Sequence, residues 1–191
     1  SISSNVVTIN PAGTFASSTA YNVQVPSTAF DDAAGNSYAG ITNATTLNFT
    51  SADVVAPTIS SVSSTTANGT YNAGDAIAIT VTFSENVTVS GTPQLTLETG
   101  SSDAVVNYSS GTGGSVLTFN YTIASGHTSA DLDFKATSSL ALNSGTIRDA
   151  AGNNATLTLA SPGATNSLGA NKALVIDGVV PTVSSVSSTT A

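Results

Sequence analysis

The chain has 191 residues, of which 7% are charged, and its eleven acidic and three basic side chains give a net charge of −8. So few Lys and Arg residues exclude a nucleic-acid partner, because basic side chains that neutralise phosphates supply most of that affinity. The absence of cysteine excludes disulfides and thiolate metal sites, and a hydrophobic content of 40% with little charge argues against disorder.

Apolar residues recur at every second position from the start of the chain, which is the period of a β-strand rather than of a helix. In the first quarter this alternation predicts strands within 5–10, 20–27 and 45–51. These resemble the last strands of a β-sandwich, which cannot bury a core without a facing sheet. We expect one of two explanations: either neighbouring chain completes this partial sandwich, or the fragment is incomplete only because of where the sequence is cut.

The clearest alternation follows in the segments AIAITVTFS and SVLTFNYTI, where every second residue is large and apolar. The predicted strands of this region lie within 58–64, 76–84, 93–99, 104–110, 115–123, 156–160 and 172–178. Seven short strands separated by Gly- and Asn-rich turns favour a two-sheet Greek-key sandwich. Helix is disfavoured by β-branched residues, Ser, Asn and Gly, and 129–136 is the one stretch that could form a helical turn.

One segment of the chain occurs twice. PTISSVSSTTA begins at Pro57, and PTVSSVSSTTA, which differs at one residue, begins at Pro181. An aspartate stands four positions before each copy, Asp53 in DVVAP and Asp177 in DGVVP. A repeat that brackets a domain-sized segment indicates a tandem array.

The predicted fold class is therefore all-β, with Ig-like Greek-key β-sandwich repeats in tandem. The predicted organisation is the C-terminal part of one repeat (1–52), a linker (53–56), a complete repeat (57–176), a second linker (177–180) and the first strand of the next repeat (181–191).

A second repeated motif is the turn Asp-Ala-Ala-Gly-Asn, found at 32–36 and again at 149–153. Its glycine permits positive φ, and its Asp and Asn aim side-chain oxygens into one concavity. Carboxylate and amide oxygens are the ligands that Ca²⁺ prefers. The alternative is an Asx-stabilised hairpin turn without a metal, and the motif alone favours neither.

The position of these turns in a sandwich favours a metal. The loop between the last two strands lies at the same end as the B–C loop and the start of strand A, which would bring Asp149 and Asn153 near Glu85 and Asp53. At the opposite end, Asp75 and either Asp131 or Asp133 would approach Asp177. The predicted calcium ligands are therefore Asp53, Glu85, Asp149, Asn153, Asp32, Asn36, Asp75, Asp131 and Asp177. Carboxylates gathered at a joint repel one another unless a divalent cation is bound, although loops also carry solvated acids.

The sequence resembles the bacterial immunoglobulin-like tandem repeats of large cell-surface adhesins and surface-layer-type proteins. The resemblance rests on the segments 20–41, 56–100, 117–134 and 146–183, which include AYNVQVPS, APTISSVSS, LTFNYTI and TIRDAAGN. It implies an extracellular location on the bacterial surface and a role as a spacer or adhesive module. It also implies structural calcium between domains, at Asp149 and Asn153 with Glu85 and Asp53 as partners.

We expect a structural spacer or stalk repeat whose partners are neighbouring repeats, with assembly into a homo-polymer as a further possibility. No apolar run approaches the roughly 18 residues of a membrane-spanning helix, so we expect no direct membrane insertion. The first alternative is a subunit of an extracellular filament or S-layer, in which the segment 181–191 complements a neighbour's sandwich.

The second alternative is a carbohydrate- or ice-binding module. Outward threonine rows, Thr80 with Thr82 and Thr118 with Thr122, would present ordered hydroxyl groups, although Thr is also favoured on exposed strands. An enzyme is not expected. The lone His127 lies in a Gly-rich loop without a catalytic motif, and no Ser lies in a Gly-x-Ser-x-Gly elbow.

Overall fold

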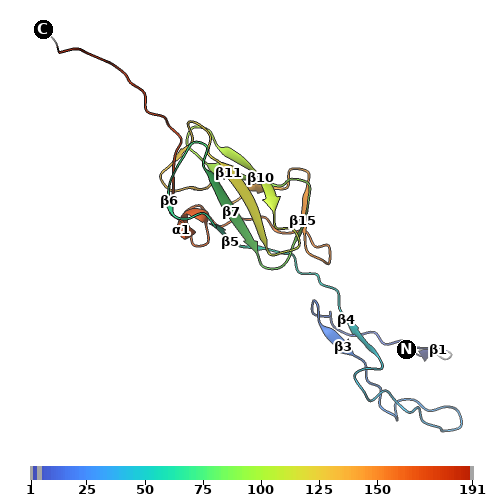
Figure 1. The fold of residues 1–191 in the computed structure, drawn as a ribbon. Coiled ribbons are helices and arrows are strands. Elements are labelled where there is room, and N and C mark those ends of the chain that lie inside the picture. The colour runs from blue at the N-terminus through green and yellow to red at the C-terminus, as the bar shows by residue number, and fades with distance from the viewer. Residues whose placement is uncertain (1, 4–5, 190–191) are drawn as a thin grey trace. The chain divides into compact units, whose positions relative to one another are not determined.

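The computed structural model describes residues 2–3 and 6–189. The chain divides into two compact units, Ser1–Val55 (unit 1) and Ala56–Ala191 (unit 2). Figure 1 shows unit 1 in blue to cyan, and it shows unit 2 from green to red with almost all of its regular structure as strands.

Unit 1 contains short antiparallel strand pairs. Its strands are β1 (Ile2–Ser3), β2 (Val6–Val7), β3 (Ala20–Asn22) and β4 (Asn48–Thr50), of which β1 pairs with β2 and β3 with β4. Each strand predicted in this unit is present but shorter than the alternation suggested. None of residues 6–55 is buried. Strands without a facing sheet gain little stabilisation from apolar burial, and these ladders extend over only two or three residues.

An aromatic cluster in unit 1 remains open to solvent. The ring centroids of Phe15 and Tyr21 lie 4.6 Å apart, and the ring of Phe49 lies 5.1 Å from Phe15 and 5.7 Å from Tyr21. Phe15 is 45% exposed and Phe49 is 40% exposed. These rings contact one another, and they remain partly exposed among the described residues of unit 1.

The larger sheet of unit 2 is antiparallel. Its strands are β5 (Ile59–Ser64), β7 (Ala76–Phe83), β9 (Gln94–Glu98), β10 (Ala104–Ser110), β11 (Val116–Thr122), β13 (Asp133–Phe134) and β14 (Leu140–Ala141). The strand order is β13-β9-β10-β11-β7-β5, and β14 also pairs with β9. The longest ladder joins β7 to β11, from Ala76 opposite Thr122 to Thr82 opposite Val116.

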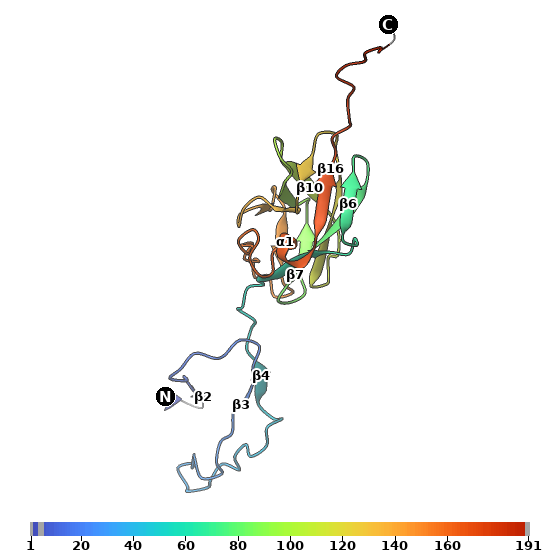
Figure 2. The same ribbon diagram turned by 90° about the vertical axis from the view of Figure 1, so that its left-hand side faces the viewer.

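The second layer consists of two small sheets and one helix. Its elements are β6 (Gly69–Asn72), β8 (Thr88–Ser90), β12 (Thr128–Ser129), β15 (Thr146–Arg148), β16 (Leu174–Asp177) and α1 (Leu168–Asn171). One sheet has the order β12-β16-β6, and the other pairs β15 with β8. Figure 2 shows β16 beside β6, to which it runs parallel.

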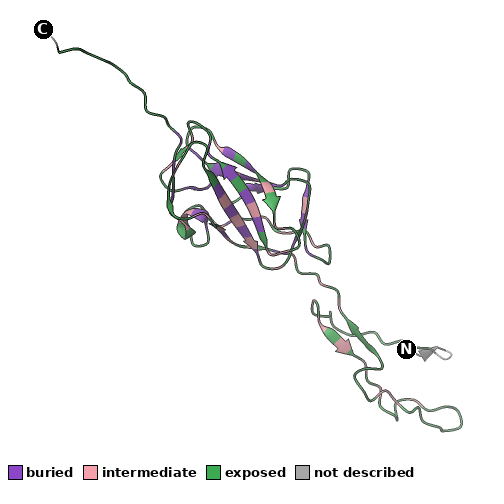
Figure 3. Ribbon diagram, viewed as in Figure 1, coloured by how far each residue is buried: buried purple, intermediate pink, exposed green. Residues whose placement is uncertain are grey.

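The core lies between these layers and follows the period of two. On β7, the inward residues Ile77, Ile79 and Val81 are fully buried, and the residues that alternate with them, Ala78, Thr80 and Thr82, are half-buried. Figure 3 shows the same alternation of buried and less buried residues along β11. Burial of each large apolar side chain stabilises the fold by about 1.5–3 kcal/mol. These alternating, mostly antiparallel strands confirm the predicted all-β sandwich.

Two local predictions were wrong. Residues 156–160 form no strand, because the Thr156 N–H donates to the Pro57 carbonyl at 2.8 Å and the Leu159 N–H donates to the Thr137 carbonyl at 2.9 Å. The backbone bonds of the segment are thus divided between the residues before β5 and the loop after β13, and the segment joins no continuous ladder. The helical turn lies at α1 rather than at 129–136. Ser167 caps it by accepting the Ala170 N–H, as serine does at many helix N-termini.

The segment 179–189 forms no strand and is largely exposed, with Val183 at 82% and Val186 at 92%. The last two residues of the predicted strand 181–191 lie outside the described residues. No helix of the described chain is long and apolar enough to span a membrane.

Candidate metal centre

The second Asp-Ala-Ala-Gly-Asn turn is a closed hydrogen-bonded motif. The Asp149 carboxylate accepts the Asn153 N–H on Oδ1 at 2.8 Å and the Asn153 side-chain amide on Oδ2 at 2.7 Å. The Gly152 N–H donates to the Asp149 carbonyl at 3.3 Å, and Gly152 has φ of 94°. Glycine is needed here because few other residues adopt positive φ without strain.

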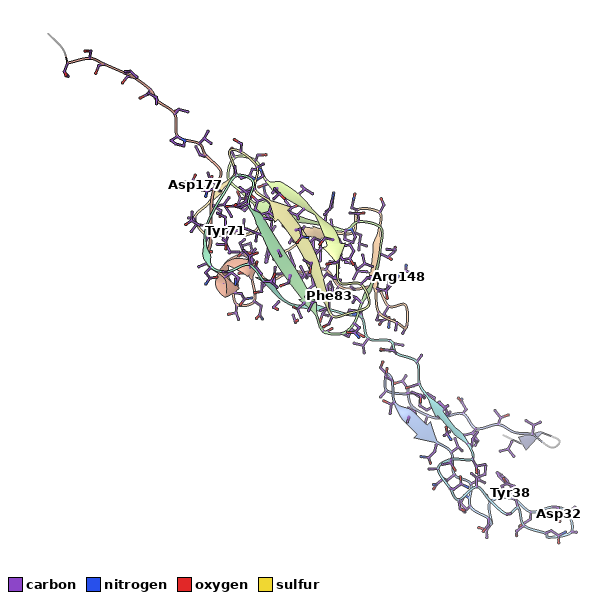
Figure 4. The ribbon with its side chains drawn as sticks, viewed as in Figure 1. Asp32, Tyr38, Tyr71, Phe83, Arg148 and Asp177 are labelled. Carbon is purple, nitrogen blue, oxygen red and sulfur yellow. The ribbon has the colours of Figure 1, made fainter. Side chains whose placement is uncertain are left out.

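The first copy of the turn has the same construction in unit 1, where Figure 4 labels Asp32. Asp32 Oδ1 accepts the N–H groups of Ala34 at 2.9 Å and Asn36 at 2.8 Å, and its Oδ2 accepts the Asn36 side-chain amide at 2.8 Å. The repeated sequence therefore specifies the same local structure twice.

The Asn of each turn donates to the Asp, because an ionised carboxylate can only accept hydrogen bonds. Asn153 and Asn36 thus turn their NH₂ groups, rather than their carbonyl oxygens, toward the neighbouring carboxylate. The sequence suggested instead that the Asp and Asn oxygens converge. The polar groups of each turn bond one another, as the Asx-turn alternative proposed. A cation could therefore bind only to the remaining lone pairs of the Asp oxygens.

These hydrogen bonds also keep the two aspartates ionised. Burial raises the pKa of Asp149, but the donors of Asn153, Gly152 and Ala151 outweigh burial and hold the pKa below its ordinary value. The side-chain amide of Asn36, followed by its backbone N–H, likewise lowers the pKa of Asp32. Both groups therefore carry a negative charge at neutral pH.

A second carboxylate lies close to Asp149 within unit 2. One ligand oxygen of Glu85, in the turn after β7, lies within 4.8 Å of one from Asp149. Asp149 is 6% exposed, whereas Glu85 is partly exposed. Ca²⁺ binds oxygen at about 2.3–2.6 Å, so two ligands of one ion can be up to about 5 Å apart. The pair therefore fits a single calcium ion.

The strand that opens unit 2 begins between the loops that carry these two acids. The Pro57 carbonyl accepts the Thr156 N–H, beyond the Asp149 turn. Thr58 is bonded to Ser84, the residue before Glu85. The Thr58 N–H donates to Ser84 Oγ at 3.0 Å, and the Thr58 carbonyl accepts the Ser84 N–H at 2.8 Å. The N-terminal end of unit 2 thus gathers the start of β5, the loop of Glu85 and the turn of Asp149.

In each linker, the aspartate accepts a hydrogen bond from the backbone N–H two residues further along the chain. Asp53 Oδ1 accepts the Val55 N–H at 3.0 Å and the Ser17 hydroxyl at 2.8 Å, and these bonds, that of Val55 first, lower the pKa of Asp53. In the second linker, Asp177 Oδ1 accepts the Val179 N–H at 3.3 Å. The same side chain thus shapes both linkers.

At the other end of unit 2, the predicted ligands are more dispersed. Figure 4 shows Asp177 at the opposite end of unit 2 from Phe83 and Arg148, which precede the Glu85 loop and the Asp149 turn. Asp75 accepts the Asn72 N–H at 2.8 Å, and Asp177 lies opposite Asn72 in the β6–β16 ladder.

Asp131 is placed next to α1 instead. A Cβ on Gly169 would lie 3.5 Å from an Asp131 carboxylate oxygen. Among the described residues, Asp75, Asp131 and Asp177 belong to no close group of three or more acidic or histidine side chains. Their role as ligands stays a prediction.

Asp133 has a role that sequence reasoning missed, although it considered this residue as an alternative to Asp131. It is 9% exposed, and its carboxylate accepts the N–H groups of Phe134 at 2.8 Å, Gly163 at 2.9 Å and Leu168 at 3.2 Å. It fixes the loop before α1. The only sequence signal was its position between Leu132 and Phe134, both of which are fully buried.

The profile of the bacterial Ig-like domain matches residues 1–51 and residues 53–163. The chain therefore belongs to the bacterial Ig-like domain family, and the predicted resemblance and fold class are confirmed. Domains of this family are commonly parts of bacterial surface proteins, where they are structural and typically non-enzymatic. Comparisons with curated proteins and with solved structures gave no match.

Proposed function

We propose that this chain is part of the stalk of an extracellular bacterial adhesin or surface array, in which Ig-like repeats act as spacers. The observation that carries the proposal is the recurrence of two motifs, the Asp-Ala-Ala-Gly-Asn turn and the aspartate-led linker, in a chain of family-matched segments. Repeats that contact their neighbours build extended structures without a new fold for each unit.

The mechanical part of this function has a basis in the β6–β16 ladder. The two strands are parallel, with Leu174 opposite Gly69 and Asp177 opposite Asn72. Tension along the chain reaches β6 from its N-terminal end, through β5 and its pairing with β7, and it reaches β16 from its C-terminal end. In a parallel pair, these are opposite ends of the ladder, so its hydrogen bonds are loaded in shear and resist together.

Single-molecule pulling of the 191-residue chain tests this role. The Ala173 carbonyl accepts the Gly69 N–H of β6, and the Leu174 carbonyl accepts the Leu132 N–H on the other side. Because residues alternate, Val175 faces β6, and Val175→Pro removes one bond of the β6–β16 ladder. We expect a lower unfolding force for Val175→Pro, and an unchanged force for Val175→Thr, which keeps the N–H. Equal forces for both variants would exclude this ladder as the resisting element.

We further propose that calcium stiffens the junctions between repeats. The proposal is supported by the proximity of Glu85 and Asp149, and by the start of β5 between their loops. Asp53 lies four residues before Pro57, and a chain of that length spans at most about 14 Å, so its carboxylate is a candidate third ligand. By the same repeat logic, Asp177 would serve the next junction, with Asp75 and Asp131 as further candidates.

Calorimetric titration of the chain with CaCl₂ tests the site. Glu85→Gln removes one proposed ligand charge, and Glu98→Gln removes one charge from β9 as a matched control. We expect weaker calcium binding in Glu85→Gln alone. Equal binding by both variants would show that Glu85 is not a ligand.

A further inference from the structure

The chain remains hydrogen-bonded to unit 2 for one residue beyond β16. The Gly178 N–H donates to the His127 carbonyl at 2.8 Å, and the Gly178 carbonyl accepts the Gly126 N–H at 2.9 Å. Because Thr128 already pairs with Asp177, these bonds extend the β12–β16 ladder past the last assigned strand residue. Both main-chain polar groups of Gly178 are therefore held by the turn 124–127.

Only glycine fits at this position. A Cβ on Gly178 would lie 2.5 Å from the Ala124 carbonyl oxygen and 2.8 Å from the His127 carbonyl oxygen. Both obstacles are main-chain atoms, so no side-chain rotation relieves them. The glycine is required by the close approach of two backbones.

The turn is itself fixed to the core by an aromatic pair. Tyr121 of β11 is 2% exposed, and its hydroxyl lies 2.8 Å from His127 Nδ1. The two rings are stacked, with centroids 5.9 Å apart. Burial raises the pKa of Tyr121 to about 12, so the hydroxyl stays protonated and able to bond the imidazole.

We propose that the turn 124–127, anchored by Tyr121, is a clamp that fixes the direction in which the chain leaves unit 2. Bending between this unit and the chain that follows then begins only after Gly178, at Val179–Pro181. Val179 and Val180 are 57% and 65% exposed, in keeping with a segment beyond the clamp. The clamp requires no metal, and it goes beyond the proposed calcium site.

The linker after unit 1 is held by a different hydrogen-bond acceptor, which explains why it has valine where the second linker has glycine. Val54 occupies the place of Gly178, and its N–H donates to Ser17 Oγ at 3.0 Å rather than to a main-chain carbonyl. A side-chain hydroxyl can adjust to a Cβ, whereas a main-chain turn cannot. The glycine is therefore needed in the second linker only.

Amide hydrogen exchange on the 191-residue chain in excess chelator tests the clamp, since chelation separates it from any calcium effect. In the wild type, we expect the amides of Gly126 and Gly178 to exchange more slowly than that of Val180. Gly178→Ala should accelerate exchange at Gly126 roughly five- to tenfold, the change expected for the loss of about one hydrogen bond. Gly69→Ala is the control, because its Cβ would meet only ordinary contacts at 3.8 Å or more.

Tyr121→Phe provides a second variant that keeps the buried ring and removes the hydroxyl. It should accelerate exchange at Gly126 and Gly178 and leave the β7 amide of Ile79 unchanged. The proposal is overturned if the wild-type amide of Gly178 exchanges as fast as that of Val180. It is also overturned if both Gly178→Ala and Tyr121→Phe leave Gly126 protected.

Discussion

Replacement of Asp133 by alanine should be among the most destabilising changes at a polar position of unit 2. The substitution removes the acceptor of three N–H groups, of which those of Phe134 and Leu168 belong to fully buried residues. Gly163 is exposed, so water can replace its bond. A buried donor without a partner costs about 1–3 kcal/mol, so two such donors reduce the free energy of unfolding by about 2–6 kcal/mol.

Asp133→Asn separates this explanation from a general effect of charge. The Asn oxygen can still accept from Phe134 and Leu168, and its NH₂ faces only the exposed Gly163 N–H, so we expect a loss of about 1 kcal/mol. Asp131→Ala is the control, because this exposed neighbour should change stability by less than about 0.5 kcal/mol.

Urea unfolding followed by circular dichroism measures all three variants. Unit 1 has no buried residue among 6–55, so the cooperative transition reports on unit 2. A midpoint for Asp133→Ala equal to that of Asp131→Ala would refute the role assigned to the buried carboxylate.

Two further predictions concern the core and the acidic turn. Leu117→Ala, at a fully buried position of β11, should lower the free energy of unfolding by about 2–5 kcal/mol. Val116→Ala, at a position 41% exposed, should change this free energy by less than about 1 kcal/mol. Equal urea midpoints for the two variants would contradict the assigned strand faces. Asn153→Ala removes the side-chain amide donor, which is one of the groups that hold the pKa of Asp149 below its ordinary value, and it keeps the backbone donors. A lowered folded-state pKa stabilises the fold above the unfolded-state pKa, and this contribution is lost as the pH falls through the lower value. The difference in Tm between wild type and Asn153→Ala should therefore be largest at neutral pH and should shrink as the pH falls below the ordinary pKa of an aspartate. A difference that is constant with pH would rule out this linkage.

The strands that the sequence predicted well are those that bury one complete face. β7 and β11 alternate because their inward residues fill the core, and the printed pattern is enough to find them. The sequence of β6 favours a turn instead, because Gly69 and Asn72 are typical turn residues. Its strand conformation comes from parallel pairing with β16, a partner more than one hundred residues away that local sequence cannot specify.

The converse error has the same cause. Residues 156–160 alternate like a strand, yet their backbone groups are divided between Pro57 and Thr137. Alternation reports which side chains face the core, and it does not report whether a continuous ladder is available. Leu159 is accordingly buried, at 3% exposed, in a segment that is not a strand.

For the candidate site, the sandwich topology predicted more about which side chains lie close together than the Asp-Ala-Ala-Gly-Asn motif did. Loop positions in the sandwich led us to expect Glu85 near Asp149, and the structure brings their carboxylates within 4.8 Å. The internal hydrogen bonds of the turn could not be read from the motif, because they depend on which amide atom Asn153 presents to Asp149. The metal itself stays a prediction.

The most direct measurement for the proposed calcium-stiffened stalk is NMR relaxation of the 191-residue chain with millimolar calcium and with excess chelator. If calcium joins successive repeats, the amides of units 1 and 2 should report one common rotational correlation time with calcium and two shorter ones with chelator. The Tm of unit 2 should also rise with calcium. Unchanged tumbling and an unchanged Tm after chelation would contradict the account.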